Sequence, residues 1–380
     1  TYGANTTGAA SFTNAGAIEL GNVSAGSLAV NSNSGGANGS VTQAAGTDLT
    51  VATGATSIAA GTGAITVGSN ASTLHSFGAT GGAVSVTTQS GLALDNVTAT
   101  SLNVTTNAGA TSGAVTQTFG DALDINAGAG AVTISAGAGK GAITLDQTTN
   151  FASFGGSGAA DTADTADALA LAAFDGSSLT VSAGGAVTQT GGLTVTGDAS
   201  VNTTGGAAIT LDSNANGVAG FAAHTTGNAT LHDTTGVALR SSSAGSLDVT
   251  AGGDITQSAA IAVTGATNVD AGSHDVVLAT AANTLGGLVT ATGTSVSVSA
   301  TGNLHANASL TGGTGNLALS ATQTLTGPTA VTTAGDISLN SGTGLTTGGN
   351  LSGANVTLSG GPISIVNNIN ATGVLTLNST

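Results

Sequence analysis

A five-residue pattern returns at long and nearly constant intervals along this chain, and this periodicity limits the possible folds more than any other feature. The pattern is Gly-x-Val/Ile-Thr-Gln, and its glutamines stand 74, 72 and 68 residues apart (43 to 117, 117 to 189, 189 to 257). Repetition at a fixed period is typical of solenoids, in which each repeat packs only on its neighbours. The copies begin at Gly39, Gly113, Gly185 and Gly253, and a worn copy is Ala321-Thr322-Gln323.

Other positions keep the same register, so the repetition is not an accident of composition. Leu-x-Val segments begin at Leu28, Leu102, Leu179 and Leu247. Phenylalanines recur where one corner of a repeat needs a larger side chain, and we expect them to fill the core; stacking on a ligand is the alternative. The structural repeat positions predicted in this way are Gln43, Gln117, Gln189, Gln257, Phe77, Phe154 and Phe221.

Composition rules out two simple alternatives to an ordered β structure. The chain has 62 Gly and only 5% charged residues, but 40% of its residues are hydrophobic. These are patterned, whereas disordered chains lack the apolar surface needed to offset the entropy of ordering. Apart from Ala, good helix formers are scarce, while Thr, Val, Ser, Gly and Asn abound, so helix is disfavoured as well.

The local signal is apolar alternation over three to five residues, ended by Gly, Asn, Asp or Ser. In Leu193-Thr194-Val195 and Ile209-Thr210-Leu211 the outer residues face one way and the threonine the other. Strands this short and this close leave no segment for helical crossovers. We therefore predict an all-β fold, a parallel β-helix with about three strands per coil of roughly 22–25 residues, and about three coils in each super-repeat of about 70 residues.

The predicted domain organisation follows from the repeats. Residues 1–324 form a β-helix of super-repeats, with units that begin near residues 39, 113, 185 and 253. Residues 325–380 form more divergent β-helical coils, and both prolines, Pro328 and Pro362, lie there. The chain begins without Met and has no signal peptide, so we interpret it as a mature or excised segment.

Residues 161–171 are the one stretch that could form a short helix. The register favours strand and turn, because Phe154 and Leu179 are as far apart as Phe77 and Leu102. The same alignment places Asp161 opposite Val84, at an inward position, and the sequence offers no explanation for a carboxylate there.

Charge excludes several functions. The net charge is −16, so nucleic acids and anionic membrane surfaces are excluded as partners, because both need clustered Lys and Arg. There is no cysteine and no apolar run long enough to span a bilayer. The two cations, Lys140 and Arg240, are 100 positions apart and cannot serve one hydrolase or lyase site, so we predict that the chain is not an enzyme.

Metal and cofactor sites are weakly indicated. Asp161, Asp164 and Asp167 are candidate calcium ligands, although they match neither an EF-hand loop nor a calcium-binding nonapeptide. His224 and His232 lie one strand spacing apart, and surface histidine is the commoner interpretation. No Gly-rich stretch carries the Lys of a phosphate loop, and we predict no cofactor.

The style of the repeats resembles a known family. Uncharged, Cys-free segments such as Leu193-Thr194-Val195-Thr196-Gly197, and the run from Ser246 to Ile255, are similar to the repeats of filamentous-haemagglutinin-type bacterial adhesins, which are exported by two-partner secretion. The resemblance covers nearly the whole chain but rests on repeat style, and that family's strict short repeat and N-terminal secretion domain are absent. It implies a right-handed β-helix, export to the cell surface, and a role as stalk or adhesive fibre.

The functional hypothesis is a structural shaft of a secreted or surface-attached bacterial adhesin, in adhesion or biofilm cohesion, with an extracellular location. The alternatives are a subunit of a self-assembling filament or sheath and a carbohydrate- or ice-binding β-helix. The expected partners are other copies or further coils end to end, and surface glycans or matrix polysaccharide. No nucleic acid and no membrane insertion are expected.

Overall fold

The protein is described by a computed structural model that covers residues 1–380 apart from 107–112, 126–128, 138–139, 281 and 380. Strands make up 61% of it. Within the described residues, the one helical element is a single 3-10 turn, η1 (Ser34–Gly36). The prediction of an all-β chain is therefore confirmed.

The chain divides into two compact units, Thr1–Gly191 and Gly192–Thr380, which are described separately. The strands of the first unit are β1 (Tyr2–Asn5), β2 (Ala9–Thr13), β3 (Ile18–Ser24), β4 (Ser27–Asn31), β5 (Val41–Gln43), β6 (Leu49–Ala59), β7 (Ile65–Gly68), β8 (Thr73–Thr80), β9 (Ala83–Thr88), β10 (Leu92–Ala99), β11 (Ser101–Thr106), β12 (Val115–Gln117), β13 (Ala122–Ile125), β14 (Ala131–Ser135), β15 (Ile143–Leu145), β16 (Thr148–Asn150), β17 (Ser153–Ser157), β18 (Ala160–Thr165), β19 (Leu169–Gly176), β20 (Ser178–Ala183) and β21 (Val187–Gln189).

The second unit has the same kind of short strands. They are β22 (Leu193–Thr203), β23 (Ile209–Leu211), β24 (Gly217–His224), β25 (Asn228–Asp233), β26 (Val237–Leu239), β27 (Ser242–Ala244), β28 (Ser246–Ala251), β29 (Ile255–Gln257), β30 (Ile261–Val263), β31 (Thr267–Asp270), β32 (Val276–Leu278), β33 (Thr284–Leu285), β34 (Leu288–Gly293), β35 (Val296–Ala300), β36 (Leu304–Leu310), β37 (Leu317–Ala321), β38 (Thr324–Thr326), β39 (Ala330–Thr332), β40 (Ile337–Ser341), β41 (Gly344–Thr347), β42 (Asn350–Gly353), β43 (Val356–Gly360), β44 (Ile363–Ile365), β45 (Ile369–Ala371) and β46 (Leu375–Ser379).

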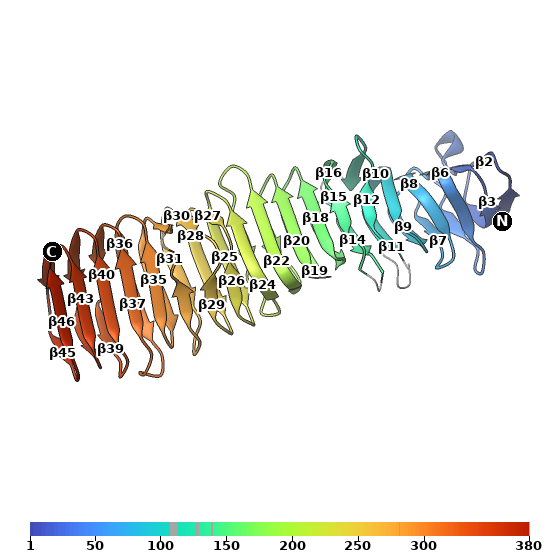
Figure 1. The fold of residues 1–380 in the computed structure, drawn as a ribbon. Coiled ribbons are helices and arrows are strands. Elements are labelled where there is room, and N and C mark those ends of the chain that lie inside the picture. The colour runs from blue at the N-terminus through green and yellow to red at the C-terminus, as the bar shows by residue number, and fades with distance from the viewer. Residues whose placement is uncertain (107–112, 126–128, 138–139, 281, 380) are drawn as a thin grey trace. The chain divides into compact units, whose positions relative to one another are not determined.

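Each strand pairs in parallel with its counterpart one coil further along the chain, which makes both units parallel β-helices (Figure 1). In the first unit one strip of paired strands runs through β5, β7, β9, β11, β14, β17, β19 and β21. A second strip runs through β4, β6, β8, β10, β12, β15, β18 and β20. Shorter segments such as β13 and β16 form the third side of the coil.

The super-repeat does not contain a whole number of coils. The Val-Thr-Gln strands β5 and β21 lie on the first strip, whereas β12, the copy between them, lies on the second. Seven steps along the first strip lead from β5 to β21, so one super-repeat advances the chain by three and a half coils rather than the three expected. Consecutive super-repeats therefore present the same motif on alternate faces.

Coil length varies around the expected value. Val84 pairs with Leu102, 18 residues on, whereas Leu102 pairs with Val132, 30 residues on. Because the extra residues lie between strands, where insertions are tolerated, the ladder register is kept while the loops lengthen.

Side chains alternate between the core and the solvent as the sequence predicts. Val195 and Leu211 are buried, while Thr194 is exposed and Thr210 is half-buried. Phe77, Phe154 and Phe221 are fully buried, in agreement with the expectation that they fill the core. The ring of Phe154 also contacts those of Phe151 and Phe174, with centroids 6.4 and 6.2 Å apart.

Two predictions about segments can be compared with the structure. Residues 161–171 are strand and turn, because they hold the end of β18 and the start of β19. A change of organisation does occur near residue 324, where β39, β42 and β45 form a separate three-stranded sheet. The division into compact units nevertheless falls between Gly191 and Gly192, and the boundary at 324 stays a prediction.

Candidate functional site

The three aspartates proposed as calcium ligands do not come together. Asp161 is buried on the inner side of β18, Asp164 is half-buried on the outer side of the same strand, and Asp167 is exposed in the turn that follows. Successive strand residues face opposite ways, so the first two carboxylates diverge. Among the residues that the structure describes, no three His, Asp or Glu side chains lie close enough to hold a metal ion.

The histidines and the two basic side chains lie in ordinary surface settings. His224 pairs in register with Ser243, and His232 with Thr250. The Nζ atom of Lys140 is 2.7 Å from Oδ1 of Asp175, and Nε of Arg240 is 2.7 Å from Oδ1 of Asp198. Exposed ion pairs of this kind contribute little stability, and neither cation is placed among carboxylates that could act as acid and base.

The repeated glutamines are clamps between coils. The Gln117 side chain donates to the carbonyl of Asp121, 2.9 Å away, and its Oε1 accepts the Gln147 N–H of the next coil. Gln43 does the same with the carbonyl of Thr47 and with the Gly68 N–H. The glutamine is retained in the motif because one amide satisfies backbone groups of two successive turns.

Buried amides at another corner join three coils, a feature that the sequence analysis missed. Oδ1 of Asn216 accepts the Leu193 N–H at 2.9 Å, and its Nδ2 donates to the carbonyls of Leu211 and His232 at 3.2 and 2.9 Å. Asn283, one repeat later, makes the same three kinds of contact. Its signal was available as an Asn two residues before an inward apolar residue in each repeat.

Acidic residues in the second unit also have a structural role. In six successive coils a side-chain oxygen before a strand accepts the backbone N–H of its counterpart one coil further on, at 2.8–3.4 Å. A ladder of this kind satisfies corner amides that have no strand partner. Its accepting residues are Asp254, Asp275, Ser295, Asn316, Asp336 and Asn355.

Two carboxylates lie in the core, in different settings. Asp233 is fully buried; its Oδ2 accepts the Val218 N–H at 2.6 Å and its Oδ1 accepts the N–H and the hydroxyl of Thr235 at 2.7 Å. Asp161 is 2% exposed; its Oδ1 accepts the Ile143 N–H at 2.7 Å, but its buried Oδ2 has no partner. Burial raises the pKa of Asp161 from 3.8 to about 6, against the lowering effects of the Ile143 hydrogen bond and of Lys140. Burial and then the neighbouring Asp146 raise the pKa of Asp164.

One face of the second unit is a neutral polar surface, which we call the hydroxyl face. It consists of two outward-facing rows on β35, β37, β40, β43 and β46, aligned by the strand register. All but one of its ten side chains are hydroxyls or amides, and none is ionisable. The rows are Ser297, Ala318, Ser338, Thr357 and Thr376, and Ser299, Ser320, Asn340, Ser359 and Asn378.

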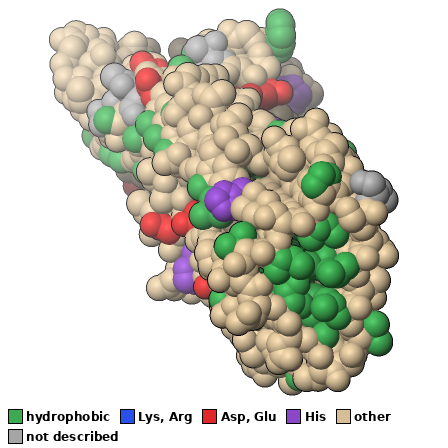
Figure 2. Space-filling model, turned by 90° about the vertical axis from the view of Figure 1, so that its left-hand side faces the viewer, with side chains coloured by type: hydrophobic (Ala, Val, Ile, Leu, Met, Phe, Trp, Pro, Cys, Tyr) green, Lys and Arg blue, Asp and Glu red, His purple; other side chains and the backbone are tan. Residues whose placement is uncertain are grey.

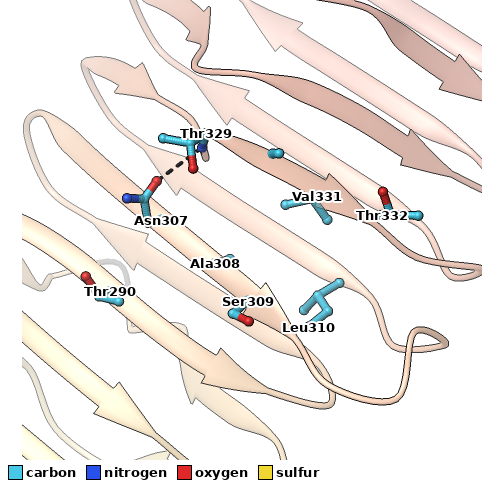
Figure 3. Close-up of a pocket in the computed structure, with 9 residues that line it drawn as sticks. Thr290, Asn307, Ala308, Ser309, Leu310, Thr329, Val331 and Thr332 are labelled. Carbon is cyan, nitrogen blue, oxygen red and sulfur yellow. Dashed lines mark hydrogen bonds between the residues drawn. The ribbon is translucent and has the colours of Figure 1, made fainter.

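A shallow groove of about 370 Å³ lies on another side of this unit (Figure 3). It forms where β36 and β39 do not continue the same ladder, since β39 is the edge of the small sheet. Ala308, Leu310 and Val331 supply apolar surface, and the Thr329 N–H donates to Oδ1 of Asn307 at 3.1 Å across it. The groove contains no ionisable side chain.

The last coil exposes apolar side chains. Val366 and Val374 are 60% and 61% exposed, and Ile365, Leu375 and Leu377 are exposed as well. Figure 2, which views the molecule from this end, shows hydrophobic side chains gathered there. A surface of this kind accepts a further coil, because both its apolar residues and the open edge of β46 lack a covering layer.

Three segments of the chain, residues 7–79, 157–225 and 226–292, match a family described as repeats of unknown function (DUF5649). The chain belongs to this family. The matches cover more than half of its length, and each spans about one super-repeat. No curated protein and no solved structure matches the chain.

The DUF5649 segments agree with the register of the β-helix. Each contains one Val-Thr-Gln or Ile-Thr-Gln strand, namely β5, β21 or β29. The unmatched residues between 79 and 157 contain the longest coil, from Leu102 to Val132, so the repeat is there most altered in length. Among the described residues, no helix has the length and apolar character needed to cross a bilayer.

Proposed function

We propose that this chain is a shaft segment of a large secreted or surface-attached bacterial adhesin, which holds other parts of the molecule away from the cell or within a biofilm matrix. The observation that carries the proposal is the continuous parallel ladder within each unit. In it, glutamine, asparagine and aspartate side chains serve to join coils. Such residues would converge in a cleft if catalysis were the function.

The resemblance to filamentous-haemagglutinin-type adhesins supports an extracellular location. A chain without cysteine, with short uncharged coils and 18 acidic residues, also suits an exposed fibre that must remain soluble. The secretion partner and the adhesive tip belong to the same proposal.

Electron microscopy of the producing cells, with antibodies against this chain, tests the proposal. We expect label on thin fibres at the cell surface, and loss of adhesion when the segment is deleted. Replacement by an unrelated β-helix of equal length should restore adhesion if the segment acts as a spacer. Label confined to the cytoplasm, or adhesion unaffected by the deletion, would contradict the proposal.

The exposed apolar coil favours a second candidate, a subunit of a self-assembling filament. In this case the purified chain forms polymers whose length grows with concentration. Val374→Asp and Leu375→Asp should abolish them, whereas Thr194→Asp, on an exposed strand position of the same unit, should not. A chain that stays monomeric at all concentrations would eliminate this candidate.

The hydroxyl face favours a third candidate, contact with neutral polysaccharide or ice. Its rows repeat at the strand spacing of about 4.8 Å, and no charge interrupts them. Ser320→Asp with Asn340→Asp should then weaken binding to neutral polysaccharide or abolish ice shaping, while the same two charges placed on the opposite strip should have no effect. Equal effects from both pairs would argue against a specific face.

A further inference from the structure

The carboxyl of Asp161 occupies a position that sister repeats fill with an apolar side chain. Asp161 pairs with Leu179 in the same way that Val84 pairs with Leu102 and Ala229 pairs with Leu247. All of these side chains point into the core, and Asp161 is 2% exposed. A buried carboxylate needs hydrogen bonds or a counter-charge to all its oxygens, and Oδ2 of Asp161 has neither in direct contact.

The space for this carboxyl is made by glycines. A Cβ atom on Gly158 would lie 2.1 Å from Oδ1 of Asp161, and one on Gly176 would lie 3.0 Å from Oδ2. The residue that corresponds to Gly176 is Ala99 in the preceding repeat and Ala244 in the following one, each three residues before the leucine of the Leu-x-Val segment. The core is therefore shaped to hold a carboxyl group at this position and not at the sister positions.

The charged groups near Asp161 are few. On its own strand, Asp164 faces outward, beside Asp146 of the adjacent coil. From the turn before β15, the Lys140 ammonium acts on Asp161 through space, but its contact is with Asp175 at the end of β19, 2.7 Å away. The remaining neighbours are the Ile143 N–H, the Phe174 ring beside Gly176, and Leu179.

We propose that Asp161 makes the coils formed by β15, β18 and β20 a pH-sensitive joint, closed when the carboxyl is protonated and loosened when it ionises. The protonated group carries no net charge, so the orphaned oxygen is tolerated in the apolar core. Ionisation leaves a charge next to Phe174 with a single donor, and the coil relieves this by opening Oδ2 to water.

The direction of the effect follows from linkage. The pKa of Asp161 is raised from 3.8 to about 6 in the folded chain. Its contribution to stability is therefore complete below about pH 4 and is lost as the pH rises through 6. A shift of this size changes the opening equilibrium by about 100-fold between these limits.

Hydrogen exchange of the whole chain, followed by mass spectrometry of peptides from residues 141–183, measures this opening. After correction for the intrinsic exchange rate, protection should fall about 100-fold between pH 4 and pH 7. Peptides from residues 41–68, in the same unit, should show no such change. An equal change in both regions would mean that the whole unit responds, and would overturn the proposal.

Two variants separate the carboxyl from its surroundings. Asp161→Val restores the residue type of the sister repeat, and Asp161→Asn keeps the acceptor for Ile143 without an ionisable group. Both should make protection in residues 141–183 independent of pH. The matched control is Asp164→Asn, which removes the outward carboxyl of the same strand and should leave the dependence in place. Persistence of the pH dependence in both Asp161 variants, or its loss in the control, would refute the proposal.

Discussion

The two core carboxylates of this protein, one in each unit, show how a β-helix accommodates a charge. Asp233 lies at the end of β25 and receives three hydrogen bonds, whereas Asp161 lies at the start of β18 and receives one. A strand end offers backbone N–H groups that have left the ladder, as those of Val218 and Thr235 have. A strand interior offers few, because its N–H groups already bond to the neighbouring coil. Burial is the same in the two cases, and the supply of donors differs.

The comparison predicts the largest effect for a carboxylate placed where no donor exists. Val195→Asp should destabilise the second unit by about 3–5 kcal/mol, because an unpaired charge is then buried between coils. Thr194→Asp, one residue away and exposed, should cost roughly 0.5 kcal/mol or less. Denaturant unfolding followed by circular dichroism measures both, and equal costs would mean that the inside–outside assignment is wrong.

The next effect concerns the satisfied carboxylate. Asp233→Ala should destabilise the second unit by about 3 kcal/mol, because the buried Val218 and Thr235 N–H groups lose their acceptor. The cost should be accompanied by faster hydrogen exchange at residues 217–239. A loss no larger than that of Thr194→Asp would show that these hydrogen bonds do not hold the coils together.

A smaller effect tests the role of the glycine beside Asp161. In the sister repeat, Val84→Asp should be strongly destabilising, and Ala99→Gly in the same chain should recover about 1–2 kcal/mol of the loss. Ala99→Gly alone should be mildly destabilising, since it only removes a buried methyl group. Additive effects in this double-mutant cycle would show that the glycine does not make room for the carboxyl.

The smallest effect is that of the exposed ion pair. Lys140→Gln should change the stability of the first unit by less than about 1 kcal/mol, because Lys140 and Asp175 are both substantially exposed. It should nevertheless raise the pKa of Asp161 above 6, since Lys140 lowers that pKa in the native chain. The midpoint of the hydrogen-exchange change in residues 141–183 reports this shift, and an unchanged midpoint would place Lys140 too far away to matter.

Much of the core could be predicted from local patterns. The alternation in Leu193-Thr194-Val195 assigned the buried and exposed residues correctly, because side chains on a strand face opposite ways whatever the tertiary context. The fixed position of Phe77, Phe154 and Phe221 in the repeat likewise indicated core residues. The roles of Asn216 and Asn283 were not predicted, since their partners come from three coils that are distant in sequence.

The sequence by itself therefore determined the fold class, the strand period and the inward set of residues, because these depend on short-range alternation and on repetition along the chain. Only the tertiary structure decided which copies of the motif share a face. The three-and-a-half-coil advance depends on the summed lengths of many loops, and no single repeat encodes it. The same holds for Asp161 and Asp233: each is one aspartate in the sequence, and the backbone groups and glycines brought beside it by neighbouring coils decide whether its charge is satisfied.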